Sequence, residues 1–177
     1  VLEGISVDGS GGRFDLLDAA VRIAADEVRV EGVAVRNALF GILANRASRL
    51  VIRGNEVDGN PAKALGMRGD AIRLWYSQHN VIEGNRFRRA RDLTFTNSAD
   101  NRIVGNRFED GRYGMHIIFS PRLLVENNHL SNTGTGIIIL YSPELVLRGN
   151  HVAHALTAGG AGIVFKESND ALVENNA

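Results

Sequence analysis

The feature that most constrains the fold is a short repeat that closes on asparagine and recurs along the chain. Each copy is a strand-like run of apolar and charged residues, followed in most cases by glycine; the closing residues are Asn55, Asn85, Asn106, Asn128, Asn150 and Asn176. They lie 30, 21, 22, 22 and 26 residues apart. A period near 22 residues with short β-type runs is typical of a solenoid, in which each repeat forms one coil stacked on the last.

A second marker keeps the same frame, a serine eight residues before the closing asparagine; these serines are Ser77, Ser98, Ser120, Ser142 and Ser168. The two longer spacings are therefore expected to be insertions, at Gly59 to Met67 and at about Ala155 to Gly160. Strand alternation sorts each coil into inward and outward columns, and the inward columns are almost wholly apolar. Ile103, Val125 and Leu147 are expected to stack as consecutive interior residues.

These patterns predict an all-β chain, a right-handed parallel β-helix of about 22-residue coils, because parallel crossovers are nearly always right-handed. Each closing asparagine is expected to occupy a left-handed bend and to bond through its amide to the neighbouring coil. Residues 1–177 are expected to form a single domain. Both ends lie in repeat-like sequence without an obvious cap, which suggests a fragment or the ordered core of a longer chain.

Composition narrows the classes of partner. Basic and acidic residues number 20 each, so no bulk field attracts nucleic acid, and none is expected as a partner. The absence of cysteine excludes disulfides and thiolate metal sites. The longest apolar runs, such as residues 137–140, are too short to span a bilayer, so no membrane-spanning segment is expected.

The outward positions of the strand before each marker serine are unusually apolar. Trp75, Ile118, Ile138 and Leu140 would form a patch across neighbouring coils, and a solvated strand would carry mainly polar residues there. Arg73, His116 and Lys166 border this patch. An exposed tryptophan among aliphatic side chains with a basic rim favours protein docking, so these seven residues are the candidate partner-binding residues. The alternative is that another segment of a longer chain covers the patch.

Two longer strings carry a family resemblance. Gly69-Asp70-Ala71-Ile72-Arg73-Leu74-Trp75-Tyr76-Ser77, and later Gly111-Arg112-Tyr113-Gly114-Met115-His116 with Leu140-Tyr141-Ser142, resemble the NosD family. The likeness covers residues 69–176 well, and the first third only as generic repeats. Two features depart from the family pattern. The coil with Thr94-Phe95-Thr96-Asn97-Ser98 lacks the aromatic-Tyr-Ser ending, and methionine occurs only at Met67 and Met115.

The resemblance implies a periplasmic or secreted accessory protein that assists copper delivery to nitrous oxide reductase, or its maturation, together with an ABC transporter. Copper is the implied metal. The implied partners are the membrane subunit of the transporter and the copper-receiving reductase. On this hypothesis the protein is not itself an enzyme.

Histidines are the ligands left for copper, because thiolates are absent and methionines are few. His129 and His151 each follow a closing asparagine in adjacent coils, so their side chains should emerge about 5 Å apart. His154 lies three residues further on and could approach the same edge. These three histidines are the candidate metal ligands. The alternative is a surface column of side chains, since Arg86 and Arg107 occupy the equivalent positions in earlier coils.

A rival hypothesis is a β-helix protein that binds carbohydrate or acts as a uronate polysaccharide lyase or epimerase. Such chemistry needs a cation against the carboxylate and a base for the C5 proton. Arg73, Arg112, Tyr113, His116 and Lys166 supply suitable side chains on or near one face, but no aspartate cluster for calcium accompanies them.

Overall fold

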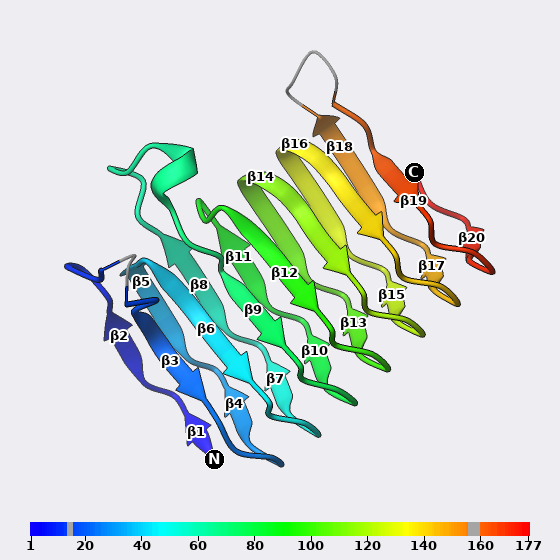
Figure 1. The fold of residues 1–177 in the computed structure, drawn as a ribbon. Helices are drawn as coiled ribbons and strands as arrows, with labels where there is room; N and C mark the ends of the chain where they lie inside the picture. The colour runs from blue at the N-terminus through cyan, green and yellow to red at the C-terminus, as the bar shows by residue number, and fades with distance from the viewer. Residues whose placement is uncertain (14–15, 156–159) are drawn as a thin grey trace.

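The chain forms a stack of coils in which all strand pairings are parallel, as the computed structural model of residues 1–13, 16–155 and 160–177 shows (Figure 1). The N-terminal and C-terminal coils lie at opposite ends of the stack. The structure confirms the predicted all-β parallel β-helix. No helix among the described residues is long and apolar enough to cross a membrane.

One sheet collects the short strands that lead to each closing asparagine. In spatial order these asparagine strands are β1 (Leu2–Glu3), β4 (Arg29–Glu31), β7 (Val51–Arg53), β10 (Val81–Glu83), β13 (Arg102–Val104), β15 (Leu124–Glu126), β17 (Val146–Arg148) and β20 (Leu172–Glu174). Each strand pairs with the one a full repeat later, which places like positions of successive repeats in register.

The other sheet system holds two kinds of strand. Those that follow the asparagine are β2 (Ser6–Asp8), β5 (Ala34–Ala38), β8 (Glu56–Gly59), β11 (Arg86–Arg88) and β18 (His151–Ala155). Those at the position before the marker serine, the serine strands, are β3 (Ala19–Ile23), β6 (Phe40–Asn45), β9 (Ile72–Trp75), β12 (Asp92–Thr96) and β19 (Ile163–Lys166). The long strands β14 (Arg107–Ile118) and β16 (His129–Leu140) continue through both positions.

The core runs along the axis of the stack and consists of the inward columns. Ile103, Val125 and Leu147 are fully buried and paired in register, as predicted. In β20, at the edge of its sheet, the equivalent Val173 pairs on one side only and is exposed. The core is therefore built by contact between neighbouring coils.

The closing asparagines form a buried ladder. Asn106 donates through Nδ2 to Oδ1 of Asn128 at 3.0 Å and to the carbonyl of Ile82 at 2.9 Å, and its neighbours repeat this pattern. The predicted amide bonds between coils are thus confirmed. The predicted left-handed bend is wrong for these asparagines, because the positive φ falls on the residue before, such as Gly105 at 63°. The asparagine side chain bonds to the neighbouring coils, and the adjacent glycine adopts the left-handed backbone conformation.

The serines form a second ladder along another corner. The backbone N–H of Ser98 donates to Oγ of Ser120 at 3.0 Å, and the backbone N–H of Ser120 donates to Oγ of Ser142 at 2.9 Å. The two predicted insertions differ in outcome. The first contains the 3₁₀ helix η1 (Leu65–Met67) and projects from the stack (Figure 1). The second lies mostly on residues 156–159, outside the described residues.

Candidate functional site

The predicted outward patch occupies one face, the outward side of the serine strands. Parallel register places Trp75 beside Thr96, Thr96 beside Ile118, and Ile118 beside Leu140. The neighbouring column runs from Arg73 through Thr94 and His116 to Ile138, and Lys166 follows Leu140 in the next coil. The structure therefore brings all seven candidate partner-binding residues onto one face. Trp75 is 42 % exposed, and the aliphatic members are partly buried among their neighbours.

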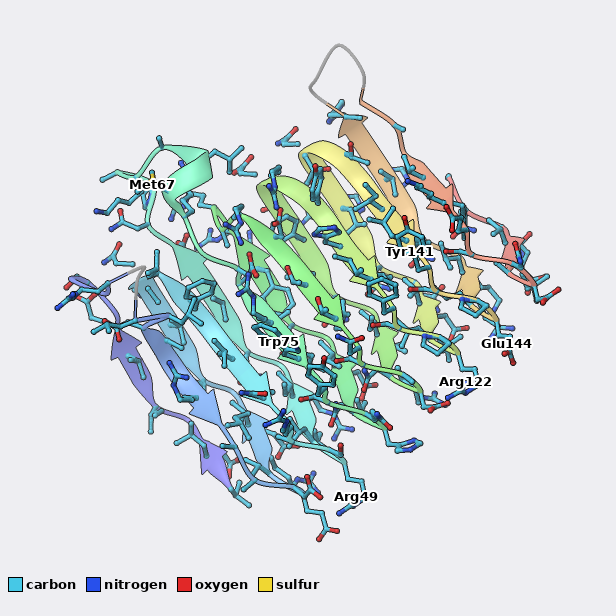
Figure 2. The ribbon with its side chains drawn as sticks, in the orientation of Figure 1. Arg49, Met67, Trp75, Arg122, Tyr141 and Glu144 are labelled. Carbon is cyan, nitrogen blue, oxygen red and sulfur yellow. The ribbon has the colours of Figure 1, made fainter. Side chains whose placement is uncertain are left out.

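A groove of about 260 Å³ crosses this face. It arises because β12 carries the small side chains Thr94 and Thr96 between larger ones on either side. On β9 the neighbours are Arg73 and Trp75, and on β14 they are His116 and Ile118; Arg91, Asp92 and Arg112 complete the lining. We call this hollow the threonine groove. Trp75 lies in the central part of the stack (Figure 2).

A chain of ion pairs lies beneath one end of the groove. Asp70 accepts from Nε of Arg73 at 2.8 Å and from a terminal nitrogen of Arg91 at 2.9 Å. Asp92 accepts from Nε of Arg91 at 3.2 Å and from Nε of Arg112 at 3.1 Å. The side chains of Asp70 and Asp92 are 0 % and 1 % exposed. Buried carboxylates with several charge-assisted bonds hold their partners in fixed positions, so the three guanidinium groups are pre-positioned.

His116 sits at the rim of this network, with its ring at 5.1 Å from that of Tyr113 in an edge-to-face contact. Burial lowers the pKa of His116, and the nearby Arg112 and Arg91 lower it further, against the opposing effect of Asp92 and Asp70. The imidazole is therefore neutral at pH 7 and can both donate and accept a hydrogen bond.

Thr94 supplies an unused polar atom. Its side chain is 7 % exposed, lines the groove, and carries a buried hydroxyl without a hydrogen-bond partner. Buried polar atoms are nearly always bonded, so this one is unusual. Because the oxygen itself is buried, it can bond a molecule in the groove only after the Thr94 side chain rotates about χ1.

The structure adds an aromatic column that sequence analysis missed. Tyr76, Phe119 and Tyr141 each precede a marker serine and have φ of 50°, 48° and 51°. Phe119 and Tyr141 stack with ring centroids 5.0 Å apart, and Tyr76 stacks at 6.3 Å on Trp75. A left-handed conformation costs a non-glycine residue about 1 kcal/mol or more, and glycine or asparagine usually occupies such a corner. The recurring aromatic-Ser pair in the sequence was the available signal for this column, which extends the apolar surface beside Trp75.

Of the three candidate metal ligands, the structure brings two together. The rings of His129 and His151 stack with centroids 4.8 Å apart and planes 14° apart. His154 does not join them, and no group of three histidine, cysteine, aspartate or glutamate residues suited to a metal occurs among the described residues. Burial, Arg107 and His151 each lower the pKa of His129, which keeps its ring neutral and able to ligate at pH 7.

The stacked rings limit what this pair can hold. Ring nitrogens project in the ring plane, so two stacked imidazoles aim their lone pairs side by side, and at least one ring has to turn for both to reach a single ion. The thioether sulfurs lie elsewhere, since Met115 is buried in the core and Met67 is exposed on the first insertion (Figure 2). A metal held by this pair would need its other ligands from water or from a second molecule.

The residues named for uronate chemistry are only partly assembled. Arg73, Arg112 and His116 line the threonine groove, and Tyr113 touches His116. Lys166 lies outside the groove lining, with its ammonium 5.7 Å from the ring centre of Tyr141.

Comparison with protein-family models matches residues 53–177 to the family described as periplasmic copper-binding protein (NosD). The chain belongs to the NosD family. The match spans both the threonine groove and the His129–His151 pair, and it agrees with the resemblance in the sequence strings. No curated protein matches the chain.

Proposed function

We propose that this protein is a periplasmic accessory protein that docks a protein partner through the outward side of its serine strands. We call that surface the docking face, made of Arg73, Trp75, His116, Ile118, Ile138, Leu140 and Lys166. On this proposal it acts with an ABC transporter in copper delivery to nitrous oxide reductase. The observation that supports it is a half-exposed tryptophan on the same face as the in-register aliphatic pair Ile118 and Leu140, with Thr96 between Trp75 and Ile118. Such anchors dominate binding energy at protein interfaces.

The charge on this face supports a specific orientation of the partner. Lys166 lies over Tyr141 at one end, and the groove arginines lie at the other, so the apolar row has basic groups at both ends. Basic groups around an apolar centre add selectivity and a faster encounter with an acidic partner surface. The partner surface is therefore expected to be apolar with acidic margins.

Pull-down with the transporter's membrane subunit and with the copper-receiving reductase as separate baits tests docking. Trp75→Ala and Leu140→Asp should each weaken capture by about 2 kcal/mol or more while circular dichroism stays unchanged. Leu65→Ala is the matched control, because Leu65 is also an exposed apolar residue but lies on the first insertion. Wild-type capture by both docking-face variants would contradict the proposal.

Copper binding by the chain is proposed to use His129 and His151. Titration calorimetry of the wild type with Cu²⁺ should show weak binding that is lost in the double alanine variant and weakens below about pH 6, as imidazole protonates. His79→Ala serves as the control histidine. Unchanged binding in the double variant would remove this site and leave the docking proposal standing.

A further inference from the structure

We propose that the threonine groove is a binding site for an acidic sugar of the uronate type, with its carboxylate against the arginines and its ring against Trp75. The proposal concerns a small ligand and does not rest on docking of a protein partner. Its basis is the combination of a cationic network, an unpartnered hydroxyl, a neutral imidazole and one indole around a single hollow.

The charges favour a singly charged anion. Arg73, Arg91 and Arg112 contribute three positive charges, and Asp70 and Asp92 offset two of them, which leaves one net positive charge at the groove. A carboxylate balances that charge, whereas a phosphate dianion leaves an excess negative charge in a partly buried site. Arg112 already donates from Nε and one terminal nitrogen to Asp92, and Arg91 likewise serves Asp92 and Asp70. A ligand carboxylate would therefore be held by the remaining terminal N–H groups of Arg73 and Arg112.

The arrangement of donors shows where such a carboxylate could bind. Arg73 donates a hydrogen bond from Nε to Asp70. A guanidinium group has five N–H donors, so the terminal nitrogens of Arg73 can still donate to a ligand. Thr94 lies next to Arg73 in register and next to His116 on the other side. A ligand oxygen above Thr94 would therefore lie between an arginine and an imidazole, and rotation of the Thr94 side chain would add its hydroxyl.

The remaining lining favours a ring with hydroxyl groups. Thr96 and Trp75 are register neighbours, so a hydroxyl and an indole lie side by side next to the carboxylate end. An indole offers a flat apolar surface to the C–H face of a pyranose, while neutral His116 and the threonines can bond to its hydroxyls. At about 260 Å³ the groove is smaller than most sites for drug-sized ligands. It therefore suits one sugar ring, with any further units of an oligomer lying outside.

The protein carries its own probe for the test, because Trp75 is its single tryptophan. Tryptophan fluorescence and calorimetry would follow titration with sodium D-glucuronate, D-glucose, D-glucose 6-phosphate and the α-amide of N-acetyl-L-glutamate. Glucuronate should bind saturably and at least about tenfold more tightly than glucose, which lacks the charged group. The glutamate derivative carries a carboxylate without the ring and should bind several-fold more weakly than glucuronate.

Two variants locate the site. Arg112→Gln should weaken glucuronate binding about tenfold, and Arg122→Gln is its matched control, since Arg122 pairs with Asp100 on a corner turn away from the groove (Figure 2). Thr94→Val should weaken binding about threefold or more with no loss of thermal stability, because it removes an unpartnered hydroxyl at nearly constant volume. If Arg112→Gln fails to fold, Thr94→Val decides.

Several results would overturn the proposal. Equal affinity for glucuronate and glucose would show that the groove does not recognise the acid group. Wild-type affinity in Thr94→Val would show that the ligand does not bind at Thr94, where the proposal places it. Equal binding of the glutamate derivative would exclude recognition of the sugar ring. Tighter binding of glucose 6-phosphate would contradict the charge argument. If Trp75→Ala loses partner capture and the wild type binds none of the sugars, the docking proposal stands and the sugar-site proposal is wrong.

Discussion

At the scale of single residues, Asp70 and Asp92 determine the geometry of the groove. Each is buried and bonds two arginines, and neither could be recognised from sequence as part of one network. In the sequence Asp70 and Asp92 lie at coil corners in different columns. They meet because Arg91 reaches both, which depends on coil stacking and on side-chain conformation and not on spacing alone.

Asp92→Asn should destabilise the protein by about 3 kcal/mol or more, because it leaves Arg91 and Arg112 without their shared anion in a partly buried place. Asp100→Asn removes an exposed pair with Arg122 and should cost less than about 1 kcal/mol. Urea unfolding of both variants measures the contrast. Equal small losses would mean that the network does not position the arginines.

His116 should make stability depend on pH. Burial lowers its folded-state pKa below the unfolded value of about 6.5, so the unfolded chain takes up the proton first as pH falls. The stability present above pH 6.5 is then lost progressively as pH falls through the folded pKa. The free-energy gap between wild type and His116→Asn should therefore shift against the wild type between about pH 7 and pH 5. The charged groups around His116 are Asp92, Asp70, Arg112 and Arg91. A free-energy gap that stays constant with pH would contradict the desolvation of the imidazole.

At the scale of elements, the repeat frame predicted the coils because each strand has the same alternation of inward and outward residues and pairs with the equivalent strand of the next coil. Ile103, Val125 and Leu147 were assigned to the core from alternation alone, and the structure places them there. The left-handed bends were misplaced by one residue. A backbone angle depends on which of two adjacent residues makes the ladder bonds, and the pattern of residue types does not distinguish them.

Val125→Asp should abolish folding or cost about 4 kcal/mol or more, since it buries a carboxylate between Ile103 and Leu147 with no partner. Val125→Ala is the control and should cost about 2 kcal/mol through the cavity alone. Thermal unfolding followed by circular dichroism gives both values. A well-folded aspartate variant would mean that this column does not face the core.

At the scale of the whole molecule, stability should vary along the stack. Each coil contacts only its neighbours, so when residues 1–177 are studied by themselves the first and last coils are stabilised on one side. Phe95 is fully buried in a central coil, whereas Phe165 is 38 % exposed at the equivalent position of the last one. Amide hydrogen exchange should be at least about tenfold slower in β12 and β14 than in β19 and β20. Uniform protection would indicate that the stack opens as one unit.

The repeat frame made the fold predictable, but it made the candidate site only partly predictable. A repeat frame shows which residues share a face, and it placed all seven docking-face residues correctly in register. The repeat frame does not show how far each side chain extends from the surface. The sequence therefore did not indicate that a coil with Thr94 and Thr96 would leave a hollow between its neighbours. The hollow at Thr94 and Thr96 follows from the difference in side-chain volume between adjacent coils.

That difference has a consequence for how such surfaces change during evolution. Leu93 and Phe95 hold the β12 coil in the core, and the outward positions between and beside them carry no share of that packing. Ligand choice can then drift through substitutions at two sites without a compensating change in the interior. Threonine in place of Ile138 and Leu140 would be expected to carve a second hollow one coil beyond His116 and Ile118, and bulky residues at 94 and 96 would seal the present one. The outward side chains of a coil can therefore change independently of the inward side chains that form the core.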